Sequence, residues 1–157
     1  MHPHFNVPTV LTLHKSAILE WKVSDVTFKN QDIYKLVEEN HAFNYQLWHA
    51  EDKARRDDMG AEFVYKAKRA IDGFNQQRNN RMEAMDEWFF NALKPTQEPT
   101  CPVHSESPGM IIDRLSILAL KAYHMEEQTR REDASEAHKK TCANKLGVIH
   151  QQLNQLS

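Results

Sequence analysis

The sequence is poor in glycine and cysteine and has no surplus of either charge, and each shortage excludes a class of protein. With 4 glycines in 157 residues, it contains no glycine-rich phosphate-binding loop and no nucleophile elbow. It also contains no HExxH zinc motif. Lysine and arginine number 20 against 22 aspartate and glutamate residues, so no basic excess favours a nucleic-acid partner. No apolar run approaches the ~18 residues of a membrane-spanning helix, and the N-terminus lacks the pattern of a signal peptide.

The cysteine content points to a compartment. Cys101 and Cys142 are the only two cysteines. A lone pair in a chain of this length is more typical of free thiols in a reducing cytosol than of a disulfide. We therefore expect a cytoplasmic protein with no membrane partner and no nucleic-acid partner.

Apolar residues recur at spacings of three and four along most of the chain, which is the pattern of amphipathic helices. The composition, 40% hydrophobic and 27% charged, is that of an ordered helical protein. We predict helices over residues 10–22, 31–56, 61–93, 108–125 and 135–157, with Thr9 as the first N-cap and Ser107 followed by Pro108 at the fourth start. The helix from 108 is apolar on nearly all sides and should be the central one.

These elements predict an all-α, single-domain bundle of four to five helices over residues 1–157, with two long central helices. Residues 1–8 are expected to be flexible, and the proline-rich stretch 94–109 is expected to be a loop, either a lid or a connector. The buried face of the third helix is predicted to hold Phe63, Val64, Ala67, Ala70, Ile71, Phe74, Met82, Met85 and Phe89. The fifth helix has a coiled-coil-like seam of Cys142, Leu146, Ile149, Leu153 and Leu156.

Polar residues interrupt the apolar faces of three helices, and they supply the candidate site. A charge buried without a partner costs several kcal/mol, so such groups must pair with each other or with a ligand. The candidates are Asn44, Trp48, Glu51, Asp52, Arg55, Asp72, Asn75, Arg78, Asn79, Asp113, Arg114 and Lys121. We expect the cations Arg55, Arg78, Arg114 and Lys121 to hold an anion, the asparagines to orient it, and Glu51, Asp72 and Asp113 to fix the cations. An ordinary surface role is least expected for Asp113 and Arg114, because their helix is apolar on nearly all sides.

Other readings of the same residues stay open. Glu51 with Arg55 and Lys68 with Asp72 are spaced i,i+4, as ordinary surface ion pairs are. The carboxylates could ligate Mg²⁺, but the interleaved arginines are poor neighbours for a metal. Glu38 and His41 form a single Glu-x-x-His unit, whereas di-iron bundles need two. We therefore assign no cofactor and no metal ligands. His41 and His124 are the only histidines we consider for acid–base chemistry, and a hydrogen-bonded interior role fits each better.

Three segments carry a resemblance to a known family: FNYQLWHAEDKARRDD, AIDGFNQQRNNRMEAMDEW and SPGMIIDRLSILALKAYHM. Together they resemble an uncharacterised family of small bacterial all-helical proteins, a domain of unknown function. The resemblance spans about residues 30–130. It implies no established activity, and it suggests an association with the synthesis of cell-surface glycans.

We interpret the chain as a helical module of unknown function whose interior polar pocket binds a small anionic ligand, or whose surface binds a protein partner. One alternative is a metal-dependent enzyme that acts on a phosphorylated or nucleotide-sugar substrate. Another is a structural protein that forms a homo-oligomer through the C-terminal helix. The sequence leaves open whether the protein is catalytic.

Overall fold

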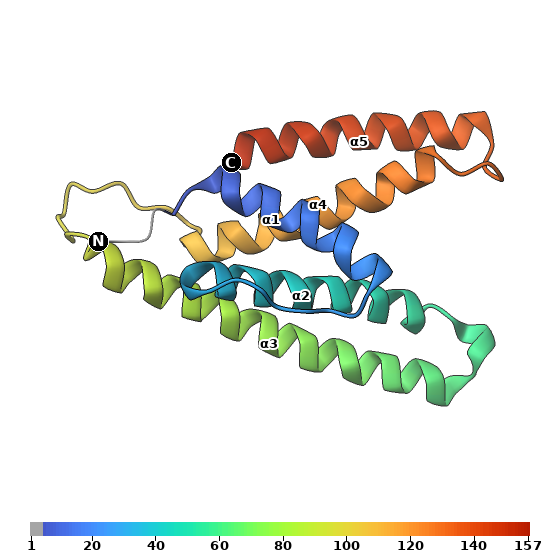
Figure 1. Ribbon diagram of the computed structural model, residues 1–157, viewed down its shortest axis with the longest axis horizontal. Helices are drawn as coiled ribbons and strands as arrows, with labels where there is room; N and C mark the ends of the chain where they lie inside the picture. Colours follow the sequence, from blue (N-terminus) through green and yellow to red (C-terminus); the bar gives the residue numbers. More distant parts are fainter. Residues whose placement is uncertain (1–4) are drawn as a thin grey trace.

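The computed structural model describes residues 5–157, and their ordered elements are five α-helices and one short 3-10 turn (Figure 1). The elements are α1 (Val7–Val23), α2 (Asp32–Ala54), η1 (Asp57–Met59), α3 (Ala61–Leu93), α4 (Pro108–Thr129) and α5 (Glu136–Leu156). No strand occurs among the described residues. The predicted all-α fold with two long central helices, α2 and α3, is confirmed. In residues 5–157, no helix combines the length and apolar character needed to cross a membrane.

The helix ends follow the capping rules, with one correction to the prediction. The Asn6 side chain, not that of Thr9, caps α1, and its Oδ1 accepts a hydrogen bond from the Thr9 backbone amide at 2.8 Å. Thr9 was the wrong cap because Pro8 fits inside the first turn, where its missing N–H is not needed. Of the stretch predicted to be flexible, residues 1–4 lie outside the described part, and Val7 and Pro8 belong to α1. Ser107 caps α4 as predicted.

The start of α4 is held tightly against α3. The Gly109 backbone amide donates to the Asp86 carboxylate of α3 at 2.7 Å. A Cβ on Gly109 would stand 2.4 Å from the Met82 carbonyl oxygen, so only glycine allows this approach. This contact fixes where α4 crosses α3, and hence where its polar residues lie.

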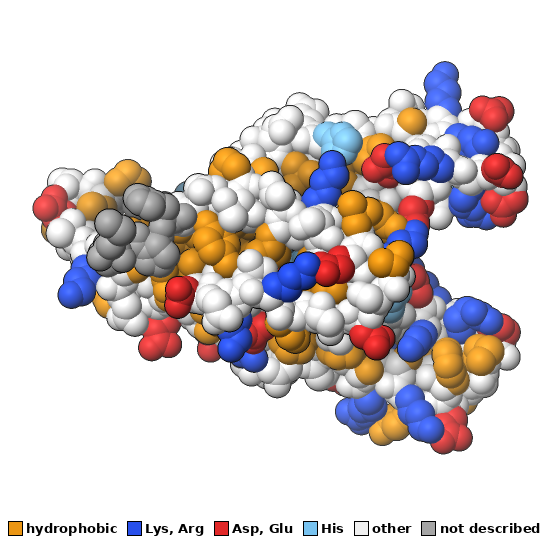
Figure 2. Space-filling model, viewed as in Figure 1, with side chains coloured by type: hydrophobic (Ala, Val, Ile, Leu, Met, Phe, Trp, Pro, Cys, Tyr) orange, Lys and Arg blue, Asp and Glu red, His pale blue; other side chains and the backbone are white. Residues whose placement is uncertain are grey.

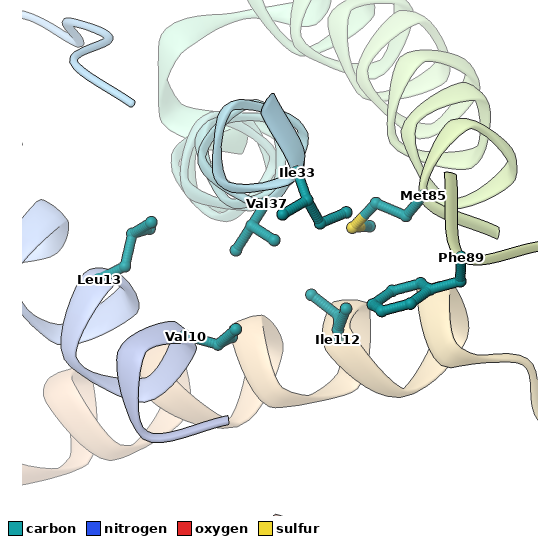
Figure 3. Packing of buried hydrophobic residues seen from close by; sticks show 7 residues of the cluster. All are labelled: Val10, Leu13, Ile33, Val37, Met85, Phe89 and Ile112. Atoms are coloured by element: carbon teal, nitrogen blue, oxygen red, sulfur yellow. The ribbon is translucent and has the colours of Figure 1, made fainter. Parts of the chain in front are cut away.

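The apolar core lies at the end of the molecule where α1, α2 and α4 begin and α3 ends. Figure 3 shows its buried side chains pointing toward one another from four helices. They are Val10, Leu13, Ile33, Val37, Met85, Phe89 and Ile112. Val10, Leu13, Ala17 and Trp21, the residues of α1 that recur at helical spacing, are all buried. As predicted, α4 is central, because it packs against each of the other four α-helices.

At the opposite end, the helices separate into two arms. The C-terminal half of α2 with the N-terminal half of α3 forms the α2–α3 arm, and α4 with α5 forms the α4–α5 arm (Figure 1). Figure 2 shows a hollow between the arms. Full burial of the α3 face was wrong in this half, where Ala67 is buried but Phe63, Val64, Ala70, Ile71 and Phe74 are only half-buried. Phe63, Ala67, Ala70 and Phe74 line a groove whose described lining comes from α2 and α3.

The seam of α5 is used within the chain. Cys142 and Ile149 are buried, and Leu146, Leu153 and Leu156 are half-buried. Since α5 packs on α4, the seam is turned toward that helix. Pairing of this seam with another copy stays a prediction.

Candidate functional site

A layer of buried polar side chains separates the apolar core from the two arms. We call it the polar layer, and its members are Asn40, His41, Asn44, Arg78, Asp113 and Ser116. Five of them are at most 3% exposed, and the Arg78 side chain is 24% exposed. Side chains this deep are expected to hydrogen-bond one another, and they do so across α2, α3 and α4, except that the Oδ1 atoms of Asn40 and Asn44 have no partner.

Asp113 is the centre of the polar layer. Its Oδ1 accepts hydrogen bonds from Asn40 Nδ2 at 3.1 Å, Asn44 Nδ2 at 3.0 Å and Arg78 Nε at 2.9 Å. Its Oδ2 accepts one from Arg78 Nη2 at 2.7 Å. The Arg78–Asp113 pair is thus bidentate, the strongest form of ion pair that these side chains make.

A second chain of hydrogen bonds runs through His41. Its Nε2 lies 2.9 Å from the His14 carbonyl oxygen, which can only accept, so Nε2 carries the proton. Its Nδ1 therefore accepts from the Ser116 hydroxyl at 2.6 Å, and the Ser116 oxygen in turn accepts from Asn44 at 3.0 Å. Burial lowers the pKa of His41 to about 4, against a weaker opposing effect of its bond to the His14 carbonyl, so the ring is neutral at pH 7.

The His14 ring of α1 packs on the polar layer. It lies against the ring of His41, with 4.5 Å between the ring centroids, and is fully buried. Neither of its ring nitrogens has a hydrogen-bond partner. Burial, and then the neighbouring His41, hold the pKa of His14 well below its usual value.

A cavity of about 290 Å³ opens beside the polar layer, between α2, α3 and α4. We call it the Trp48 cavity. Its lining residues are Asn44, Leu47, Trp48, Glu51, Asp52, Arg55, Arg78, Ile117 and Leu120. Asn44 and Arg78 belong to both the cavity and the polar layer. The Asn44 Oδ1 atom is buried and has no partner, so an acceptor is left free on a residue that lines the cavity.

The charges around the cavity nearly cancel. Asp113 neutralises Arg78. Arg55 lies 3.7 Å from the Asp52 carboxylate, and both side chains are exposed, so this pair is loose. Glu51 adds a further negative charge. The cavity therefore offers donors and acceptors together, with no excess of positive charge.

Trp48 forms one wall of the cavity, and its ring stacks on the ring of His124 of α4. The two rings are stacked, with centroids 4.5 Å apart and an interplanar angle of 6°. Burial lowers the pKa of His124, while the nearby Glu127 carboxylate opposes this effect. Glu127 lies 3.6 Å from the His124 ring and accepts a hydrogen bond from Tyr123 at 3.1 Å. This packing keeps the indole of Trp48 in one orientation.

The structure brings together most of the residues predicted as a site. Six of them line the cavity: Asn44, Trp48, Glu51, Asp52, Arg55 and Arg78. Two more, Asp113 and Asn75, are not in the lining but contact Arg78. The others lie outside it: Asp72 pairs with Arg69 on the exposed side of α3, and Asn79 and Lys121 are exposed.

Arg114 is the clearest correction. Its side chain is 53% exposed and pairs with Glu106, which precedes α4. The expectation of burial failed because the position after Asp113 turns about 100° around the helix, away from α2 and α3. The four-cation anion site is therefore not assembled, since only Arg55 and Arg78 reach the cavity.

Four buried polar residues did not enter the predicted site: Asn40, His41 and Ser116 of the polar layer, and His14 beside it. Ser116 lies three residues after Asp113 and hence on the same face of α4, a spacing that could have revealed it. Asn40 lies four residues before Asn44 on the same face of α2. His14 carries no such signal, because α1 shows one polar residue on an otherwise apolar face.

Glu38 and Asp86 bind backbone amides rather than a shared metal position. Glu38 accepts from the backbone amides of Lys29 and Asn30, at 2.8 Å and 3.3 Å, and so binds the loop before α2 rather than converging with His41. Asp86 caps Gly109. Within residues 5–157, no group of three or more His, Cys, Asp or Glu side chains is arranged to hold a metal ion.

Comparison with known proteins places the chain in a family. No curated protein and no solved structure matches it. Residues 34–157 match the family model described as "Protein of unknown function (DUF4254)". This range contains the three segments that carried the resemblance, all of the polar layer and all of the Trp48 cavity. The chain therefore belongs to the DUF4254 family of proteins of unknown function.

Proposed function

We propose that this protein is a binding module whose Trp48 cavity takes a compact, hydroxylated small molecule with a single anionic group. The observation that supports this most directly is the unpartnered Asn44 Oδ1 atom on a residue of the cavity lining. A buried acceptor without a donor costs about 1–3 kcal/mol, and a ligand hydroxyl would remove that cost.

The size and charge of the cavity limit the ligand. A volume of about 290 Å³ lies at the lower end of small-molecule sites. Since Arg78 is already neutralised by Asp113, a polyphosphate would find too little positive charge. A single carboxylate or phosphate monoester can pair with Arg55. The N–H groups of Arg78 that Asp113 does not use can donate to its oxygens.

Each wall of the cavity has a separate role in this proposal. The ring of Trp48 and the side chains of Ile117 and Leu120 contact the apolar face of the ligand. Glu51 and Asp52 accept hydrogen bonds from its hydroxyls. A sugar acid or sugar monophosphate fits these features, in keeping with the suggested association with glycan synthesis. We place the binding in the cytoplasm, where the free thiols Cys101 and Cys142 would stay reduced.

A thermal-shift screen tests this proposal. The panel holds sugar acids, sugar monophosphates, nucleotide sugars, and Mg²⁺ and Mn²⁺ alone. We expect a sugar acid or monophosphate to raise the Tm by several degrees, and Arg55→Ala and Trp48→Ala to abolish the shift. Arg69→Ala, at an exposed arginine of α3 outside the cavity, is the control and should keep it.

The other outcomes separate the alternatives. A shift that survives in both cavity variants would place the ligand elsewhere. A shift with Mg²⁺ or Mn²⁺ alone would favour the metal-dependent enzyme. A flat screen at millimolar ligand would contradict small-molecule binding and favour a protein partner.

A further inference from the structure

A second groove lies on the α2–α3 arm, on the face of α2 opposite the Trp48 cavity. Its volume is about 410 Å³, and only α2 and α3 line it. Its floor and ends are Ala50, Phe63, Ala67, Ala70 and Phe74, and its other lining residues are Gln46, His49, Lys53 and Lys66. Because α1, α4 and α5 contribute nothing to it, this apolar groove has no covering helix.

The spacing of the groove suits a crossing helix. Phe63 and Phe74 are eleven residues apart on α3, or about 16 Å along its axis. Ala67 and Ala70 lie between them, and their small side chains allow another helix to approach closely. An α-helix with its side chains is roughly 10 Å across, so one helix fits between the two phenylalanines.

The total surface of the chain leaves room for a contact of this size. The accessible surface is 10533 Å² for a mass of 18.3 kDa. A compact monomer of this mass is expected to expose about 8,100 Å², so the surplus is about 2,400 Å². A stable dimer of standard size buries about 800 Å² on each partner, which the surplus more than covers.

We propose that the groove is the docking surface for a second copy of this chain, with the two α3 helices crossing at Ala67 and Ala70. The contact is two-fold symmetric, so each copy supplies the same alanine gap and the same phenylalanine ridges to the other. Lys53 and Lys66 line the groove, and Glu62 pairs with Lys66 at 3.2 Å within the chain. In the dimer, Glu62 of each copy can also pair with a groove lysine of the other. This proposal does not depend on the ligand of the Trp48 cavity.

Sedimentation equilibrium from about 1 to 200 μM tests the oligomeric state. The chain has a mass of 18.3 kDa, and we expect a species of twice this mass to form within this range. Ala70→Glu should raise the dissociation constant at least tenfold, and the same change at the exposed Ala143 of α5 should leave it unaltered. A monomer throughout this range would overturn the proposal, and a dimer insensitive to Ala70→Glu would overturn its placement.

A crosslink keeps the test decisive if Ala70→Glu fails to fold. In a Cys101→Ser background, Ala70→Cys should form a disulfide-linked dimer on mild oxidation, whereas Ala143→Cys should not. Equal crosslinking at both positions, or at Ala143 alone, would contradict a contact at the groove.

Discussion

Asp113 accepts four hydrogen bonds from three side chains on two other helices. Removing its carboxylate leaves Arg78 without its ion-pair partner and Asn40 Nδ2 without this acceptor, whereas Asn44 Nδ2 keeps its bond to Ser116. Breaking a buried pair in this way costs about 3–5 kcal/mol. We expect Asp113→Leu to lower the free energy of unfolding by about 3 kcal/mol, the smaller value because Arg78 keeps some contact with water. Urea denaturation followed by circular dichroism measures this loss.

Arg114 provides the neighbouring control. It pairs only with Glu106 at the surface, so Arg114→Ala should change the same free energy by less than about 0.5 kcal/mol. Equal losses for the two variants would show that Asp113 is not the organising residue of the polar layer.

The buried histidines predict a pH dependence of stability. His14 and His41 have lowered pKa values in the folded protein, but titrate near 6.5 when unfolded. Between these values the unfolded chain binds more protons, so the free energy of unfolding falls as the pH drops below about 6.5. A fall of the His41 pKa from 6.5 to about 4 corresponds to about 3 kcal/mol.

Urea titrations at pH 7.5, 6.0 and 5.0 measure this slope. His14→Leu should flatten it in part, because it removes one of the two buried imidazoles. His150→Leu, at an exposed position of α5, is the control. A slope unchanged by His14→Leu would mean that His14 is not buried in the folded protein in solution.

At the scale of the element, the close approach of the start of α4 to α3 depends on Gly109. Gly109→Ala would force a methyl group to 2.4 Å from the Met82 carbonyl oxygen, so α4 must shift. We expect a loss of about 2 kcal/mol, typical of overpacking. Gly147→Ala in α5 meets nothing within 4 Å and should instead stabilise the protein by about 0.5–1 kcal/mol. Thermal melts of both variants should therefore move in opposite directions, and a shift of equal sign would contradict the tight crossing.

The helices were predictable from local signals, and the errors have physical causes. Gly60 and the Ser107–Pro108 pair mark the starts of α3 and α4, and both predictions were right. Periodicity tells which side of a helix is apolar but not how far its partners extend along it. For this reason the half-exposed state of Phe63 and Phe74 could not be foreseen: it depends on which helices line the groove that holds them, and its described lining comes from α2 and α3.

The candidate site shows the same limit. Helical spacing grouped Asn44, Trp48, Glu51 and Arg55 correctly on one face of α2. It could not tell that Arg78 faces Asp113 while Arg114 faces solvent, because that depends on the angle at which α4 crosses α3. Asp86, whose role in this crossing is a cap for Gly109, resembles an ordinary surface acid in the sequence.

At the scale of the whole molecule, stability should differ between the two ends. The core of Figure 3 draws on four helices, whereas each arm consists of two helices with half-buried faces. We expect backbone amides around Val37 and Met85 to exchange with solvent most slowly, and those around Phe63 and Cys142 at least tenfold faster. Hydrogen exchange with mass spectrometry measures this gradient at a concentration below dimer formation, and uniform protection would contradict it.

The bidentate pair of Arg78 and Asp113 also bears on selectivity. Asp113 accepts from the two N–H groups of Arg78, Nε and Nη2, that a bound carboxylate would use. It therefore competes with any ligand carboxylate for these two groups. An anion that needed both of these N–H groups would have to displace the buried Asp113 carboxylate, which accepts from Asn40, Asn44 and Arg78. Under the proposed function, a ligand that binds only the N–H groups of Arg78 that Asp113 does not use would avoid this displacement, so the pair would select against anions that need a bidentate contact.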